Sequence, residues 1–142
     1  MKINVLLVDD EKEFIKALAE RLEVRAFNVE TAFDGFEALS KIKEQDFDVV
    51  VLDVLMPGKD GIETLREIKS LRPLVNVIML TGNATVETAI EGMKSGAYDY
   101  LMKPTETNDL VDKITKAYKI KTDHEERIRK AEISKIIEKR GW

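Results

Sequence analysis

Residues 49–61, VVVLDVLMPGKDG, decide how this chain folds. An apolar, mostly β-branched run ends on a single carboxylate, Asp53, and a Pro-Gly turn follows shortly after it. An unbroken apolar run closed by turn residues predicts a strand that is buried on both faces. Open α/β sheets bind ligands at the carboxyl ends of their strands, so Asp53 is a candidate functional residue. The alternative is that Asp53 only caps the next helix. The residues at the other strand ends distinguish a functional carboxylate from a helix cap.

Four further apolar or alternating segments predict strands, at residues 3–8, 27–32, 75–80 and 98–102. Between them, apolar residues recur at steps of three and four, which indicates amphipathic helices. The apolar faces expected of these helices include Val24, Phe36, Leu71 and Met93. The expected helix caps are Asp10, Asp34 and either Thr105 or Thr107. The alternation of five strands with five helices predicts a three-layer α/β fold with a parallel sheet and right-handed crossovers.

The length and composition favour one domain with an appended element. The chain has 142 residues, of which 44% are hydrophobic and 35% charged, as in soluble globular proteins. We expect one domain over residues 1–118 and a basic, helical extension over residues 119–142. The extension carries a charge of +3 and residues 1–118 carry −7, from the net charge of −4. An acidic body disfavours nucleic acid as a direct partner.

Several classes of protein are excluded by what the sequence lacks. There are no cysteines, so disulfides, thiol chemistry and Cys-based metal sites are excluded. The first residues run directly into a strand pattern, with neither a signal peptide nor a membrane span visible. A cytoplasmic protein is the default expectation.

Side chains that could bind a ligand or take part in a reaction follow four of the five strands. Asp9 and Asp10 follow the first strand, Asp53 the third, Thr81 the fourth and Lys103 the fifth. The carboxyl ends of parallel strands share one edge, so we expect three carboxylates, a hydroxyl and an ammonium around one crevice. Crowded carboxylates repel one another unless a cation lies among them, and oxygen ligands with room for water suit Mg²⁺. The sequence therefore predicts a site that binds Mg²⁺ and then a phosphoryl group.

Asp53 is the acid that we expect to act as the nucleophile. A carboxylate can form an acyl phosphate, and the transition state of phosphoryl transfer is stabilised mainly by positioning and electrostatics. The metal ion, the Lys103 ammonium and the Thr81 hydroxyl would each hold one side of the transferred group.

These motifs together resemble those of response regulator receiver domains, the phospho-acceptor modules of bacterial two-component systems. The matching segments lie in order and at family spacing over residues 3–118: Asp9-Asp10, LDVLMPGKDG at residues 52–61, Thr81-Gly82, and GAYDYLMKP at residues 96–104. Each segment alone is weakly specific, but the set is highly specific. The resemblance implies the flavodoxin-like (βα)5 fold of the CheY-like superfamily with strand order 2-1-3-4-5.

The resemblance also implies roles for individual residues. Asp53 is the phosphorylated acid, Asp9 and Asp10 are Mg²⁺ ligands together with the Leu55 carbonyl, and Mn²⁺ is a substitute metal. Thr81 is the switch hydroxyl, Tyr100 the aromatic switch, and Lys103-Pro104 a cis peptide. Leu55 and Asn83 fall on positions that influence phosphoryl lifetime, and the branched Leu55 is expected to slow the attack of water.

The implied partner is a sensor histidine kinase or a histidine phosphotransfer protein. Its expected docking surface consists of Phe14, Ala17, Met56, Pro57 and Pro104. The chain would catalyse its own phosphorylation and dephosphorylation without being a turnover enzyme. Its output would pass through contacts with an unknown downstream protein, with neither DNA nor membrane bound directly.

Purely structural roles remain open for single residues. Other functions remain open for the whole chain. Asp10 could be only an N-cap, Tyr100 an ordinary core aromatic and Thr81 a plain strand-end hydroxyl. An aspartate-nucleophile phosphatase would need a second acid where Leu55 stands. A flavin carrier would need a phosphate loop in place of the acidic run at residues 9–11. A scaffold that is never phosphorylated is the third alternative.

The extension has its own open question. Residues 105–140 contain neither Pro nor Gly, so the last helix is predicted to run on for about 50 Å at about 1.5 Å per residue. Its apolar residues near the end are Ile128, Ala131, Ile133, Ile136 and Ile137. This segment could dock a partner, pair with a second copy as a short coiled coil, fold back or fray. A homodimer could form through this helix or through the face made by the fourth helix, fifth strand and fifth helix.

Overall fold

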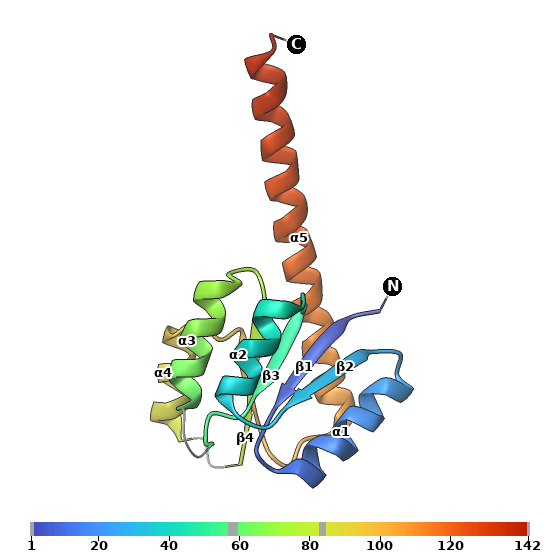
Figure 1. Ribbon diagram of the computed structural model, residues 1–142, viewed down its shortest axis with the longest axis vertical. Coiled ribbons are helices and arrows are strands. Elements are labelled where there is room, and N and C mark those ends of the chain that lie inside the picture. Colours follow the sequence, from blue (N-terminus) through green and yellow to red (C-terminus); the bar gives the residue numbers. More distant parts are fainter. Residues whose placement is uncertain (1, 57–59, 83–84, 142) are drawn as a thin grey trace.

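The computed structural model describes residues 2–56, 60–82 and 85–141. In this part of the chain five strands alternate with five helices (Figure 1). The elements are β1 (Asn4–Val8), α1 (Lys12–Val24), β2 (Asn28–Ala32), α2 (Gly35–Glu44), β3 (Val49–Leu52), α3 (Gly61–Leu71), β4 (Asn76–Thr81), α4 (Val86–Lys94), β5 (Asp99–Met102) and α5 (Thr107–Lys139). The strands pair in parallel in the order β2-β1-β3-β4-β5, so the predicted flavodoxin-like fold is confirmed.

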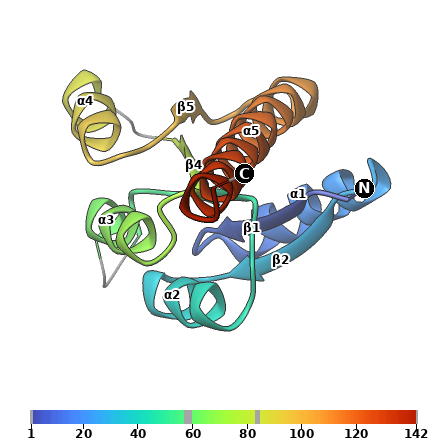
Figure 2. The same cartoon turned by 90° about the horizontal axis from the view of Figure 1, so that it is seen from above.

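Helices cover both faces of the sheet, which gives the molecule two apolar cores. One core joins the sheet to α2 and α3, and the other joins it to α1 and α5 (Figure 2). Every residue of β3 is buried, as expected of a strand covered on both sides. β2 lies at an edge and is only partly buried, as its alternating sequence predicted.

The strand register positions the ends that carry chemistry. Val8 lies opposite Leu52 in the β1–β3 pair, so the residues that follow them, Asp9 and Asp53, leave the sheet side by side. Thr81 lies opposite Met102 in the β4–β5 pair. All these ends lie at one edge of the sheet because the strands are parallel. The carboxyl edge of the sheet is the one at which β1, β3, β4 and β5 end, and the amino edge is the opposite one.

Two of the three predicted helix caps are wrong in detail. Asp34 caps α2 by accepting a hydrogen bond from the Glu37 amide, as predicted. α1 is preceded by Glu11 rather than Asp10, and α5 by Glu106 rather than a threonine, in both cases without a side-chain cap. At these two ends the chain leaves the carboxyl edge, where tertiary contacts set the backbone path more strongly than local capping does.

Several apolar side chains expected on buried helix faces are exposed instead. Val24, Phe36, Leu71 and Met93 all lie at the surface. On α4 the buried residues are the small ones, Ala89 and Gly92 among them. A Cβ on Gly92 would clash with the Met79 sulfur, so α4 approaches β4 through a residue without a side chain. This close approach turns the larger apolar residues of α4 outward.

α5 continues far beyond the sheet, as predicted. Its first turns pack on the core through Leu110, Ile114 and Ala117, while the later turns project from the body (Figure 1). The isoleucines of the projecting part are exposed: Ile128, Ile133, Ile136 and Ile137. The boundary between a domain and an extension near residue 118 lies within one continuous helix, and the division stays a prediction. Among the described residues, no helix is long and apolar enough to cross a membrane.

Candidate functional site

Three carboxylates meet at the carboxyl edge. Asp9 and Asp53 are buried and Asp10 is exposed, and each offers an oxygen within 4.8 Å of those of the other two. Asp9 and Asp10 follow β1, and Asp53 follows β3, so the parallel pairing of these strands creates the cluster. The set consists only of oxygen ligands, with one member open to solvent, which fits a hard divalent cation such as Mg²⁺.

Backbone amides orient the two buried carboxylates. The Glu11 amide donates a hydrogen bond to Asp9 Oδ1 at 2.9 Å, and the Leu55 amide donates one to Asp53 Oδ1 at 2.9 Å. Each amide lies two residues after the carboxylate that it binds, which is the geometry of an Asx turn. One oxygen of each carboxylate is thus fixed by its own turn, and the Oδ2 atoms face other groups.

Lys103 brings a positive charge to these oxygens. Its side chain is 13% exposed, and its Nζ lies 2.6 Å from Asp9 Oδ2 and 3.6 Å from Asp53 Oδ2. The Nζ also lies 4.4 Å from the centre of the Phe14 ring, a cation–π contact. The backbone amide of Lys103 donates to the Thr81 carbonyl at 3.0 Å, which ties the end of β5 to that of β4. The Lys103-Pro104 peptide is cis, as the resemblance implied.

A fourth acid belongs to this group and was missing from the residues predicted for the site. Glu11 Oε1 lies 3.0 Å from Lys103 Nζ. The sequence carried a signal, because Glu11 directly follows the aspartate pair, but acids at the start of a helix usually serve the helix dipole. Only the position of Lys103 distinguishes this contact from ordinary helix-end charge.

Burial, hydrogen bonds and neighbouring charges together shift two pKa values in the site. Burial raises the pKa of Asp9, against the hydrogen bonds from Lys103 and the Glu11 amide, and the neighbouring Asp53 charge raises it further. Burial acts to lower the pKa of Lys103, but its hydrogen bonds to Asp9 and Glu11 outweigh burial and the pKa is raised. Lys103 is therefore firmly cationic, and Asp9 is a carboxylate whose charged form would gain from further positive charge.

Thr81 supplies a hydroxyl without a partner. The residue is 1% exposed, and among the described residues its Oγ1 has no hydrogen-bond partner. Buried polar atoms are nearly always paired, so an orphan of this kind needs an explanation. Thr81 ends β4, next to the strand that leads to Asp53. A ligand bound at Asp53 is the natural candidate for the missing acceptor.

Tyr100 does not pack in the core. It lies on β5 and is 42% exposed, so the interpretation as an ordinary core aromatic is wrong. Its neighbour on the same side of the strand, Met102, is also exposed. The exposed apolar residues of α4 are Val86, Ile90 and Met93.

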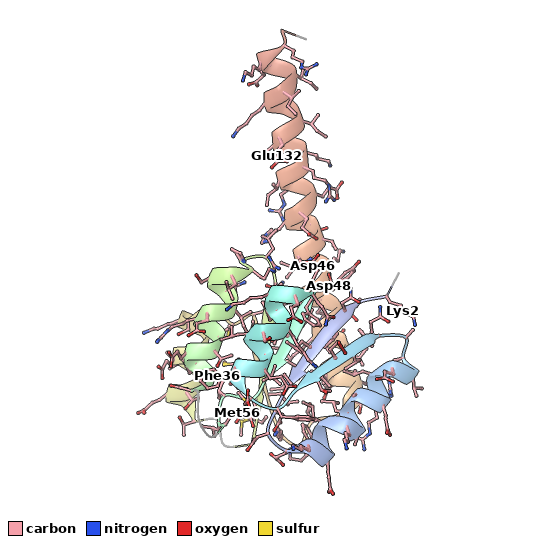
Figure 3. All side chains as sticks on the ribbon, viewed as in Figure 1. Lys2, Phe36, Asp46, Asp48, Met56 and Glu132 are labelled. Atoms are coloured by element: carbon pink, nitrogen blue, oxygen red, sulfur yellow. The ribbon has the colours of Figure 1, made fainter. Side chains whose placement is uncertain are left out.

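The predicted docking residues differ in their exposure. Ala17 and Pro104 are exposed, and Phe14 is half-buried beneath Lys103. Met56 is buried although it lies at the carboxyl edge, opposite the end of the sheet that holds Asp48 (Figure 3). Pro57 lies outside the described residues, as does Asn83, the second position connected with phosphoryl lifetime.

The chain matches the family model of the response regulator receiver domain over residues 5–115. Among curated proteins it is similar to the transcriptional regulatory protein ZraR of Escherichia coli (strain K12). The two are 43% identical over 115 residues, which cover 81% of this chain and 26% of that protein. The chain thus spans about a quarter of the length of the curated relatives that it matches.

Solved structures agree in fold. A receiver domain protein (CheY-like) from Methanospirillum hungatei JF-1 superposes with a TM-score of 0.84 at 31% identity, over 87% of this chain and 99% of that one. A BeF3-activated receiver domain, DrrB, superposes with a TM-score of 0.77 at 34% identity, over 84% of this chain and 99% of that one. The region matched by the family model contains the sheet, except for the first residue of β1, and the cluster at the carboxyl edge.

Proposed function

Because this chain belongs to the response regulator receiver domain family, the phosphorylation-dependent switches of two-component systems, we propose that Asp53 is its phosphoryl acceptor. The donor would be a phosphohistidine of a sensor histidine kinase or of a phosphotransfer protein. In the reaction a carboxylate oxygen of Asp53 bonds to phosphorus while the phosphorus–nitrogen bond breaks. The imidazole leaves with the electron pair and gains a proton from solvent.

The side chains around Asp53 have distinct proposed roles. The Leu55 amide fixes Asp53 Oδ1, so that Oδ2 is the oxygen available for attack. Lys103, at 3.6 Å from that oxygen, would bind a phosphoryl oxygen once the bond has formed. Asp9, Asp10, Asp53 and the Leu55 carbonyl would hold Mg²⁺, or Mn²⁺ in its place, and the metal would screen the negative charges that meet in the reaction.

The observation that carries this proposal is the orphan hydroxyl of Thr81. This buried hydroxyl has no hydrogen-bond partner among the described residues, which is unfavourable in the unmodified protein, and it lies at the end of the strand beside β3. A phosphoryl group on Asp53 would bring three strong acceptor oxygens to this edge. Thr81 would then move onto the phosphoryl group, and Tyr100 would change its position with it. The slow hydrolysis expected from Leu55 stays a prediction.

Signal output is proposed to pass through protein contacts. The kinase would dock near Phe14, Ala17 and Pro104, and the buried Met56 would contribute only after local rearrangement. Self-association would use the surface of α4, β5 and α5 or the projecting part of α5, and a downstream protein is the other recipient. The chain would act in the cytoplasm, would be phosphorylated rather than turn over a substrate, and would not itself bind DNA.

The test is phosphorylation by acetyl phosphate, measured as intact mass together with light scattering. We expect wild type to gain one phosphoryl group in the presence of Mg²⁺, to gain none with EDTA, and Asp53→Asn to gain none in either condition. A doubling of the molar mass on phosphorylation would place the output in self-association. Failure of wild type to gain a phosphoryl group, from acetyl phosphate and from a kinase, would favour the scaffold alternative.

A further inference from the structure

The Lys103 ammonium is held by two short hydrogen bonds to acids, neither of which is Asp53. An ammonium has three N–H donors. One hydrogen bond goes to Asp9 Oδ2 at 2.6 Å and another to Glu11 Oε1 at 3.0 Å. Asp53 Oδ2 lies 3.6 Å away, and the Phe14 ring closes a further side at 4.4 Å. The two short hydrogen bonds hold Nζ at 3.6 Å from Asp53 Oδ2, beyond hydrogen-bond distance, so an ammonium that moves toward a phosphoryl group on Asp53 draws away from at least one of its two present acceptors.

The three carboxylates differ in the free-energy cost of losing their contact with the Lys103 ammonium. Asp9 and Asp53 are buried, and each is held by a backbone amide, so a loss of Lys103 would leave a fixed charge with little solvent. The Glu11 side chain is 63% exposed, and water would solvate its carboxylate as soon as it swings away. Glu11 is the partner whose release costs least.

We propose that Glu11 is a positioning residue that holds Lys103 in the unphosphorylated state and competes with the phosphoryl group for it. Glu11 keeps the ammonium above the Phe14 ring, between the two buried carboxylates, and gives it up when a phosphoryl oxygen arrives. The side chain thus opposes phosphorylation and sets how readily the site responds to its donor. This inference rests on the proposed function, because it assumes that Lys103 binds a phosphoryl group on Asp53.

The test is the affinity for beryllofluoride, an analogue of the phosphoryl group, measured by isothermal titration calorimetry with saturating Mg²⁺. Glu11→Gln removes the charge and the strong acceptor. Glu13→Gln is the matched control, because Glu13 is also an acid exposed in the first turn of α1, and it removes one charge at the same helix end. Glu11→Asp keeps the charge but shortens the side chain by one methylene, which breaks the 3.0 Å contact.

We expect Glu11→Gln to bind beryllofluoride about two- to fivefold more tightly than Glu13→Gln, the effect typical of one exposed ion pair. Glu11→Asp should shift the affinity in the same direction. The thermal midpoint of the unliganded Glu11→Gln protein should lie slightly below that of Glu13→Gln, because the lost contact is made in the unliganded state. A merely structural role of Glu11 would lower the midpoint without tightening beryllofluoride binding.

Three results would overturn the inference. Equal affinities of Glu11→Gln and Glu13→Gln would show that the contact does not compete, and weaker binding by Glu11→Gln would show that Glu11 holds Lys103 in its productive position. A Glu11→Asp protein that behaves as wild type would assign the effect to charge rather than to contact. If wild type neither binds beryllofluoride nor accepts a phosphoryl group, the proposed function itself fails, which is a separate outcome.

Discussion

Two lysines lie among carboxylates at opposite edges of the same sheet, but the clusters around them differ in which groups are left without a partner. Lys103 at the carboxyl edge pairs with Asp9, Glu11 and Asp53. Lys121, on α5 at the amino edge, lies 3.3 Å from Asp48 Oδ1 and 3.3 Å from a Glu125 carboxylate oxygen. The exposed fractions of the two side chains are nearly equal, at 13% and 12%. Burial and charge alone therefore do not distinguish them.

The difference lies in what remains unsatisfied around each lysine. At the amino edge the Asn4 amide donates to Asp48 Oδ2, so both oxygens of that carboxylate have partners. At the carboxyl edge Asp9, Glu11 and Asp53 share Lys103, and the Thr81 hydroxyl has no partner among the described residues. A satisfied cluster stabilises structure, whereas an excess of negative charge and an orphan donor indicate a place for a cation and an anion.

The position of Lys121 explains how the projecting helix is held. Asp48 precedes β3 at the amino edge, close to where α5 leaves the body, while Glu132 lies far along the projecting part (Figure 3). Asn76 at the start of β4 also donates to the Ala117 carbonyl at 2.8 Å. These two contacts fasten α5 to the sheet, so the direction of the projecting part is set at the amino edge.

The largest expected effect is on the rate of phosphorylation, which should depend on Lys103 but not on Lys121. Lys103→Met should slow phosphorylation by acetyl phosphate about 100-fold, because it removes a charged group aimed at the transferred phosphoryl. Lys121→Met should leave this rate within about twofold of wild type, because its pair lies at the other edge. The rate is followed by intact mass over time. Equal losses in the two variants would remove the functional distinction between the edges.

The orphan hydroxyl permits a second test of the carboxyl edge. Thr81→Val keeps the shape of the side chain and should lower the beryllofluoride affinity about tenfold, because one hydrogen bond to a charged group is lost. The same variant should leave the free energy of unfolding of the unliganded protein unchanged or raise it, because it removes no hydrogen bond to any of the described residues. Beryllofluoride titration and urea denaturation provide the two readouts. A destabilised Thr81→Val protein would mean that the hydroxyl is already bonded.

A stability comparison tests the amino edge. Lys121→Met should lower the free energy of unfolding by about 1 kcal/mol, since it leaves Asp48 with less compensation in a partly buried site. Lys130→Met is the control, because Lys130 forms an exposed pair with Glu126 and is 74% exposed. Its loss should cost no more than about 0.5 kcal/mol. Urea denaturation measures both, and an equal cost would show that Lys121 is an ordinary surface lysine.

The smallest effect is a dependence of that difference on pH. Burial acts to lower the pKa of Lys121, but hydrogen bonds to Glu125 and Asp48 outweigh it and raise the pKa above its ordinary value of 10.5. The stabilisation is therefore complete below pH 10.5 and is lost as the pH rises through the folded-state pKa. The difference in unfolding free energy between wild type and Lys121→Met should shrink above this pH. The difference for Lys130→Met should stay small throughout, and a Lys121 difference that grows with pH would contradict the pairing.

The local sequence pattern was sufficient to predict the strands and helices, but not to predict which face of each helix is buried. Period and turn residues predicted each strand and helix to within a few residues, and the long α5 was read from the absence of Pro and Gly. The outward faces of Met93 and its neighbours on α4 were not foreseen, because the close approach of Gly92 to Met79 depends on two elements. Glu106 likewise replaced the predicted threonine cap where the chain returns from the carboxyl edge.

The alternation of strands and helices follows from the sequence pattern, and with it the residues at the strand ends: Asp9, Asp53, Thr81 and Lys103. Which of these residues touch depends on the packing of the whole chain, and that packing also brings Glu11 and Lys121 into the two clusters. Lys103 and Asp9 are 94 residues apart, and Lys121 and Asp48 are 73 residues apart. Contacts over such separations depend on strand register, helix packing and side-chain reach, and a periodic pattern along the chain specifies none of these distances.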